Sequence, residues 1–280
     1  MDVVSDAISA MRLGHPSSHR LRIDGSGCTR LPPFGGAGFH VVLKGGCSLL
    51  PDGGDPVTLG VGDAVLLPHG TGHALGGSPT AAEVLCGQYR LDCSRIHPLL
   101  AEMPRVIHLP SRVGGHVELS AAIDLLAGEL DDSRPGSCIA LPNLLDLLLV
   151  YMIRAWMAEA TSGAWPRVLG DPVTAAALRA LHSDPAAPWT IERLAAAVSV
   201  SRPTLARRFT ALVGRPPMAY LTWWRVILTA TLLRDTSDTL ASIAARVGYG
   251  SPYALSHAFQ REFGTTPGRY RKAAGRAPGT

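Results

Sequence analysis

The segment SRPTLARRFTALVGRPPMAY (residues 201–220) has the pattern of a capped helix that ends at a glycine and is followed by a proline-marked turn. Fifty positions later the chain reads SPYALSHAFQREFGTTPGRY (residues 251–270). Six residue pairs recur at this offset of 50: Ser201 and Ser251, Leu205 and Leu255, Phe209 and Phe259, Gly214 and Gly264, Pro217 and Pro267, Tyr220 and Tyr270. We therefore predict two copies of one helical unit that share a scaffold and differ on their outer faces.

Each copy is preceded by a second short helical pattern and a tight turn, so each is predicted to be a helix-turn-helix unit. At 100° per residue, the apolar positions of each second helix face inward and a polar face points outward. In the first copy the outward and flanking positions are Arg202, Pro203, Ala206, Arg207, Arg208 and Thr210. In the second copy they are Pro252, Tyr253, Ser256, His257 and Gln260. Because such a helix fits the major groove and flanking arginines bind phosphate, we expect these faces to bind double-stranded DNA.

The composition is that of an ordered soluble protein with its charge unevenly distributed. The 280 residues are 46% hydrophobic and 17% charged, a length that allows two domains. Residues 166–280 carry 15 Arg and Lys against 6 Asp and Glu, a net charge of +9; residues 1–165 carry 11 against 16, a net charge of −5. The basic half indicates binding to a polyanion. The five cysteines are scattered and the N-terminus lacks an apolar signal segment, so we expect a cytoplasmic, nucleoid-associated protein with reduced thiols and no membrane partner.

The distribution of apolar runs, turn residues and helical patterns along the chain predicts an α+β protein with three parts. Residues 1–112 contain short apolar runs between Gly- and Pro-rich turns, which favours a small antiparallel β-barrel or sandwich. Residues 113–165 carry two helical patterns, and the second, NLLDLLLVYMIRAW (residues 143–156), has leucines on most of its sides. A helix of this kind must be covered on most sides, so we expect a homodimer through this element. Residues 166–275 are helical throughout and contain both helix-turn-helix units.

The C-terminal part resembles the AraC/XylS family of bacterial transcription regulators. WTIERLAAAVSVSRPTLARRF (189–209) is similar to the first helix-turn-helix of the family, and YLTWWRVILTATLLRDT (220–236) is similar to its linker helix. SIAARVGYGSPYALSHAFQREFGTTPGRYR (242–271) resembles the second unit with the signature ending of the family. The resemblance implies DNA contacts from Arg202, Pro203, Ala206, Arg207, Pro252, Tyr253, Ser256 and His257. It also implies RNA polymerase as a partner if the protein is an activator.

The N-terminal part resembles a cupin. GDAVLLPHGTGHAL (62–75), which contains His73, is similar to the second cupin motif, whereas FGGAGFHVVLKGG (34–46) has His40 but lacks the HxH and Glu of the metal-binding first motif. A catalytic cupin metal site needs three to four protein ligands, and here only His73, with His40 or His69 as helpers, could be a ligand. We therefore expect no catalytic residues and no cofactor, and we favour a structural role for His73 over a bound metal. A cupin joined to AraC-type units resembles a regulator architecture in which the barrel senses and the intervening helices dimerise. One branch of it responds to reactive chlorine species through cysteines, which singles out Cys86, with Cys28 or Cys93 as a candidate resolving thiol.

Two functions remain open at this point. The first is a one-component transcription regulator whose cupin domain binds a small effector, with His40 and His73 as polar anchors, or senses an oxidant through Cys86. The second is a metal-dependent cupin oxygenase or isomerase with a helical appendage. The tandem repeat and the incomplete first cupin motif favour the regulator.

Overall fold

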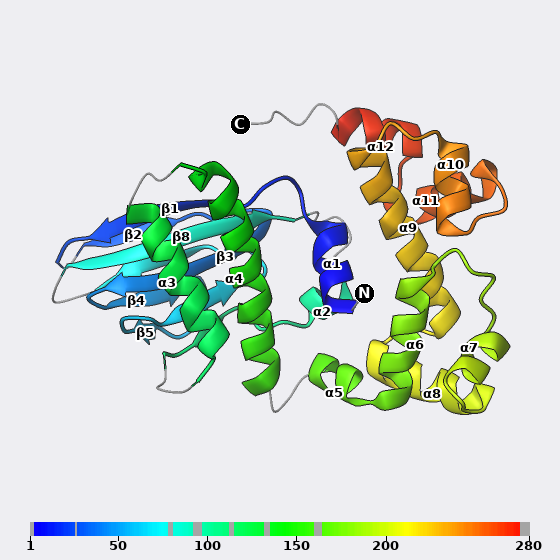
Figure 1. Ribbon diagram of the computed structural model, residues 1–280, viewed down its shortest axis with the longest axis horizontal. Coiled ribbons are helices and arrows are strands. Elements are labelled where there is room, and N and C mark those ends of the chain that lie inside the picture. Colours follow the sequence, from blue (N-terminus) through cyan, green and yellow to red (C-terminus); the bar gives the residue numbers. More distant parts are fainter. Residues whose placement is uncertain are drawn as a thin grey trace. The chain divides into compact units, whose positions relative to one another are not determined.

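The structure is a computed structural model of the 280-residue chain, and it describes residues 3–25, 27–77, 81–91, 97–111, 115–131, 135–159 and 164–274 (Figure 1). The chain forms two compact units. One unit consists of Arg12–Cys93 and Leu100–Thr161, and the other of Met1–Met11, Ser94–Leu99 and Ser162–Thr280. These units and the three parts expected from the sequence divide the chain differently, because the first residues pack with the C-terminal helices.

The first unit is built on a two-sheet antiparallel sandwich. The strands are β1 (Ser17–Ile23), β2 (Cys28–Leu31), β3 (Gly36–Lys44), β4 (Cys47–Pro51), β5 (Val57–Leu59), β6 (Ala64–Leu67), β7 (His73–Gly76), β8 (Ala82–Arg90) and β9 (Ile107–Leu109). One sheet has the order β1-β8-β3-β6-β9 and the other the order β2-β7-β4-β5. The α+β class with a cupin-like sandwich is confirmed. A closed barrel is not formed, because the strands hydrogen-bond within two separate sheets.

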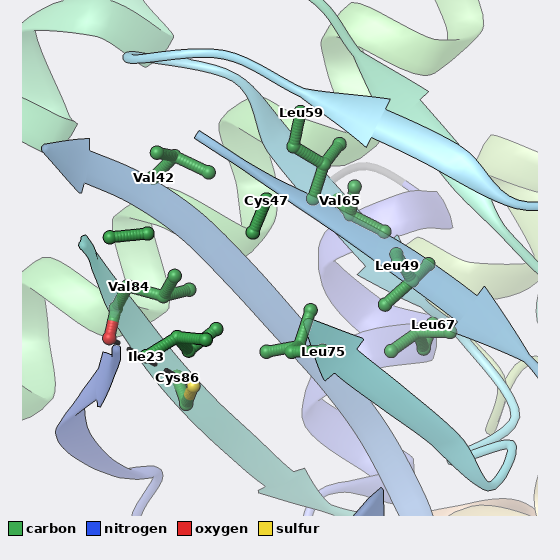
Figure 2. Close-up of a cluster of buried hydrophobic side chains, with 11 residues drawn as sticks. Ile23, Val42, Cys47, Leu49, Leu59, Val65, Leu67, Leu75, Val84 and Cys86 are labelled. Atoms are coloured by element: carbon green, nitrogen blue, oxygen red, sulfur yellow. Dashed lines mark hydrogen bonds between the residues drawn. The ribbon is translucent and has the colours of Figure 1, made fainter. Parts of the chain in front are cut away.

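A cluster of aliphatic side chains fills the space between the two sheets. Val42, Leu49, Val65 and Leu75 are fully buried in it (Figure 2). Seven consecutive residues of β3 are buried, so this strand lacks the alternation of a half-exposed strand. This pattern requires cover on both faces of the strand.

Helices α3 (Val117–Asp131) and α4 (Ser137–Glu159) cover the outer face of the larger sheet (Figure 1). The Tyr89 hydroxyl of β8 donates a hydrogen bond to the Leu145 carbonyl of α4, and Arg20 Nη2 of β1 donates to the Ala127 carbonyl of α3 at 3.1 Å. Both helices lie where the sequence predicts helical segments. By length and composition α4 also fits a membrane span, but here it packs against the sheet and α3 through buried residues that include Leu145 and Leu148.

The second unit is helical in its described residues. Its helices are α1 (Val3–Met11), the start of α2 (Pro98–Ala101), α5 (Ala164–Gly170), α6 (Pro172–Ser183), α7 (Ile191–Ala197), α8 (Arg202–Val213), α9 (Pro217–Asp235), α10 (Leu240–Val247), α11 (Pro252–Phe263) and α12 (Pro267–Ala274). Helices α7 and α8 form the first helix-turn-helix, α10 and α11 the second, and α9 lies between them in the chain. The tandem arrangement predicted from the repeat is therefore confirmed.

The shared residues of the repeat have the same structural role in both copies. Ser201 and Ser251 each cap a helix by accepting a hydrogen bond from the backbone N–H three residues later. Gly214 and Gly264 end the helices with φ of 76° and 68°, a left-handed conformation that favours glycine.

The apolar members of the repeat build equivalent cores. Phe209 is fully buried and meets the Tyr220 ring edge-on at 5.7 Å between ring centroids. Phe259 is buried likewise and meets Tyr270 edge-on at 5.4 Å. The repeat thus preserves one capped helix and one aromatic contact, which leaves the outer residues free to differ.

Candidate functional site

The outward face of α8 presents the positions predicted to contact DNA. Leu205, Phe209 and Val213 are buried beneath it. Arg202, Pro203, Arg207 and Arg208 are exposed, and Ala206 is partly exposed. The helical period therefore predicted which face of α8 is exposed, because a buried apolar stripe determines which side of a helix remains in solvent.

Two of the three arginines on this face form ion pairs with carboxylates that lie outside α8. Arg202 Nη1 lies 2.7 Å from Glu192 Oε1 of α7, and this hydrogen bond is the main reason why the pKa of Glu192 is lowered to about 2. Arg208 Nη1 lies 3.6 Å from Asp171 Oδ2, the residue that caps α6. Within the described part of the chain, Arg207 has no carboxylate partner.

The outward face of α11 is less basic and more aromatic. Pro252, Tyr253 and His257 are exposed, and Ser256 is partly exposed. Tyr253 lies in the first turn and is 82% exposed, an unusual position for a large ring. Its ring is available for apolar contact with a partner, and its hydroxyl for a hydrogen bond.

Several arginines that contribute to the +9 charge support the fold instead. Arg225 of α9 donates to the backbone carbonyls of Pro185 and Ala187 at 2.7 and 2.9 Å. Arg271 of α12 donates to the Leu233 and Asp238 carbonyls. Net charge therefore overstates the number of cations that can meet phosphate. The sequence contained no signal that separated these two classes of arginine.

In the sandwich unit, His40 of β3 and His73 of β7 meet between the two sheets. Their Nε2 atoms are 2.7 Å apart, and both residues are buried. Burial is the main reason why the pKa of His40 falls to about 3, and burial also lowers the pKa of His73. Both rings are therefore neutral at neutral pH.

The hydrogen bonds define the tautomer of each ring. His73 Nδ1 lies 2.8 Å from the Thr71 carbonyl, which only accepts, so Nδ1 carries the proton and Nε2 a lone pair. His40 Nε2 must then donate to His73 Nε2, which leaves the lone pair on His40 Nδ1. This atom is buried and has no hydrogen-bond partner among the described residues. The histidine pair therefore presents one unsatisfied acceptor inside the sandwich.

A hollow lies at the loop that precedes β7. It has a volume of about 670 Å³, and its lining includes Phe34, Asp52, His69, Thr71 and Arg105. Thr71 contributes both to this lining and, through its carbonyl, to the position of His73. His69 Nε2 is instead 2.9 Å from the Met103 carbonyl, which gives His69 a structural contact.

Cys86 lies on β8 directly opposite His40 of β3 and His19 of β1. Its side chain lies among the aliphatic residues of the core (Figure 2), and burial is the main cause that raises its pKa to about 12. The thiol is therefore protonated at neutral pH. Cys28 is exposed on β2 of the other sheet, and the four described cysteines are free, so no disulfide joins it to Cys86. Cys93, the other candidate resolving thiol, lies outside the described residues.

In the described residues, no group of three or more His, Cys, Asp or Glu side chains is arranged to hold a metal ion. The only metal-ligand candidates from the sequence were His73 and, as helpers, His40 or His69. Of these, the structure brings together His40 and His73.

Comparison with known proteins agrees with both units. A family model described as Cupin matches residues 2–158, and one described as Helix-turn-helix domain matches residues 194–273. A putative AraC-like transcription regulator of Streptomyces lividans is 34% identical over 97% of this chain and 98% of its own length. A second, of Streptomyces antibioticus, is 38% identical over 84% and 86%. The RCS-specific transcriptional activator RclR of Escherichia coli is 30% identical over 84% of both chains. The chain therefore belongs to the family of AraC-like transcription regulators, whose DNA-binding helix-turn-helix units follow a cupin domain here.

Proposed function

We propose that this regulator is a one-component sensor in which a small molecule or oxidant acts on the sandwich and alters the DNA binding of the two helix-turn-helix units. The observation that carries the proposal is the pair of equivalently capped helices, α8 and α11, whose different outer faces are both exposed. Residues 1–112 are assigned to sensing, 113–165 to dimerisation and 166–275 to DNA binding. We assign it no enzymatic activity, since the relatives are named as transcription regulators.

On the DNA-binding face we assign Arg207 to base recognition and Arg208 to phosphate. Arg207 is exposed and has no carboxylate partner in the described residues, so it can turn its planar group to a base edge. Arg208 is already oriented by Asp171, and a charge held in this way suits a backbone contact. We assign Arg202, Pro203 and Ala206 to the rest of this contact. In the second unit the contact is assigned to Pro252, Tyr253, Ser256 and His257.

The test is a binding experiment with a duplex selected by the wild-type protein from a random-sequence pool. Arg207→Ala should weaken binding by about 1–3 kcal/mol and relax the preference at one base position. Arg208→Ala is the matched control, because it should weaken all sequences alike and reduce the dependence of affinity on salt. Unchanged affinity and base preference in Arg207→Ala would show that α8 does not recognise bases through this residue.

For the sensor we favour a ligand pocket anchored by the histidine pair. The lone pair of His40 Nδ1 lacks a partner in the described residues, and a buried acceptor of this kind is costly until a donor reaches it. The effector we infer therefore carries a hydroxyl or N–H group on an otherwise apolar body, because the surrounding core is aliphatic. The hollow beside Thr71 is the proposed entrance.

The oxidant alternative requires Cys86 to become a thiolate, with Cys28 or Cys93 as a second thiol. The protonated, buried state of Cys86 opposes this in the resting structure. One relative is named an RCS-specific activator, and this name is what supports the oxidant alternative.

We further propose that the protein is a cytoplasmic, nucleoid-associated homodimer that recruits RNA polymerase if it activates transcription. The dimer is assigned to α3 and α4. Leu125 of α3 is 59% exposed and Leu147 of α4 is 39% exposed, and both line a hollow of about 580 Å³ between the two helices. We propose that the same apolar surface of a second copy of the chain packs into this hollow, as the two-fold symmetry of a homodimer requires.

A further inference from the structure

Helix α1 belongs to the DNA-binding unit, although the chain enters the sandwich directly after it. The helix packs against α6 and α9, and its buried residues include Val3, Ala7 and Met11. Thr231 Oγ1 of α9 donates a hydrogen bond to the Ala10 carbonyl at 2.9 Å. The first residues of the chain therefore complete the core around the helix that follows the first recognition helix.

A buried polar network specifies how α1 docks. His182 Nδ1 of α6 lies 3.1 Å from Asp6 Oδ2 of α1, and the two side chains are 0% and 5% exposed. His182 Nε2 lies 2.8 Å from the Tyr220 hydroxyl of α9. A buried carboxylate is strongly unfavourable unless it is paired, so α1 cannot slide or rotate on this surface without losing the Asp6–His182 pair.

A second segment joins the same network. The chain leaves the sandwich after β8, and His97 is again part of the DNA-binding unit. His97 Nε2 lies 3.2 Å from the Tyr220 hydroxyl, and the His97 backbone N–H donates to Met11 Sδ at 2.9 Å. Tyr220 thus receives contacts from α6 and from a residue that follows the strand of Cys86.

The two segments are also paired where they belong to the sandwich. Leu13 N donates to the Arg90 carbonyl at 2.8 Å, and Arg12 forms an isolated antiparallel bridge with Leu91. In the DNA-binding unit the pairing continues through Met11 and His97. The two segments that join the units are thus linked to each other within the sandwich and again within the DNA-binding unit.

We propose that α1 and the residues at His97 form a latch on the first helix-turn-helix unit, and that the docked latch is the state with high affinity for DNA. The proposal rests on the DNA-binding role assigned above. Helix α9 contacts α8, α10 and α11, so it determines the separation of the two recognition helices. Docking of α1 on α9 and α6 orders that spacer, and release removes buried contacts from it. A signal in the sandwich can then alter DNA affinity through β8 and its two paired segments.

The first test is hydrogen exchange of the full-length wild-type protein with and without the selected duplex, with a scrambled duplex as control. Because coupling is reciprocal, DNA that prefers the docked state must stabilise docking. We expect the amides of residues 3–11 to exchange at least several-fold more slowly with the selected duplex than with the scrambled one. Equal exchange with both duplexes would overturn the latch. Failure of the wild-type protein to select any duplex would instead contradict the DNA-binding role itself.

The second test compares Asp6→Ala with Ser9→Ala, an exposed residue of the same helix. Asp6→Ala removes the partner of His182 and should raise the exchange of α1 and weaken binding of the selected duplex about tenfold. Ser9→Ala should behave as the wild type in both assays. Faster exchange of α1 with unchanged DNA affinity would overturn the coupling. If Asp6→Ala does not fold, the wild-type exchange experiment decides alone.

Discussion

Replacement of His40 by Gln should remove part of the acid sensitivity of the sandwich. In the folded state burial holds the pKa of His40 at about 3, whereas in the unfolded chain it takes its ordinary value of 6.5. As the pH falls from 6.5 towards 3, the unfolded chain binds a proton at His40 that the folded chain does not bind. The contribution of a neutral His40 to stability is thus complete above pH 6.5 and decreases as the pH falls.

The expected magnitude follows from the two pKa values. Each pH unit below the unfolded pKa lowers the free energy of unfolding by about 1.4 kcal/mol, so between pH 7 and pH 5 the loss from His40 is about 2 kcal/mol. The side-chain amide of Gln can still donate to His73 but does not titrate. The pH-dependent loss in His40→Gln should therefore be about 2 kcal/mol smaller than in the wild type.

The assay is urea unfolding at pH 7, 6 and 5. Unfolding is monitored by hydrogen exchange of peptides from β3 and β8, so that the measured stability is that of the sandwich alone. His15→Gln, a substitution of an exposed histidine in the same unit, is the control and should keep the wild-type pH dependence. Equal losses in the wild type and His40→Gln would refute the inference that His40 is buried in its neutral form.

Three further predictions test the sensor, the dimer and the repeat. Cys86→Ser should leave the response to a small-molecule effector intact; loss of a response to hypochlorite in this variant, with basal DNA binding retained, would establish the oxidant alternative instead. Leu148→Asp should unfold the sandwich because Leu148 is fully buried. Leu147→Asp should remain folded and be monomeric by light scattering, since Leu147 is 39% exposed. A dimeric Leu147→Asp protein would show that this surface of α3 and α4 does not form the dimer. Gly264→Ala should lower the free energy of unfolding by about 1 kcal/mol, because the φ of Gly264 is 68°. Gly268→Ala, within α12, should raise the free energy of unfolding by about 0.5–1 kcal/mol. Equal effects of the two substitutions would contradict the left-handed conformation of Gly264.

The helical unit was largely predictable because its determinants are local. The serine caps, the left-handed glycines and the Leu205 and Phe209 stripe act within one or two turns of helix, so spacing alone revealed them. The same spacing identified the exposed faces of α8 and α11. The sandwich was predictable as a class, since short apolar runs between turns favour antiparallel strands, but its separation into two sheets depends on pairings between distant strands.

What only the tertiary structure decided are contacts between residues far apart in the chain. Periodicity shows which face of a helix is buried but not which partner covers it, so the pairing of Arg208 with Asp171 had no sequence signal. The same limit applies to the docking of Asp6 on His182, 176 residues away. Cys86 and His40 show the chemical consequence, because their protonation states follow from desolvation. Desolvation is a property of the packed interior, and the order of residues along the chain does not contain it.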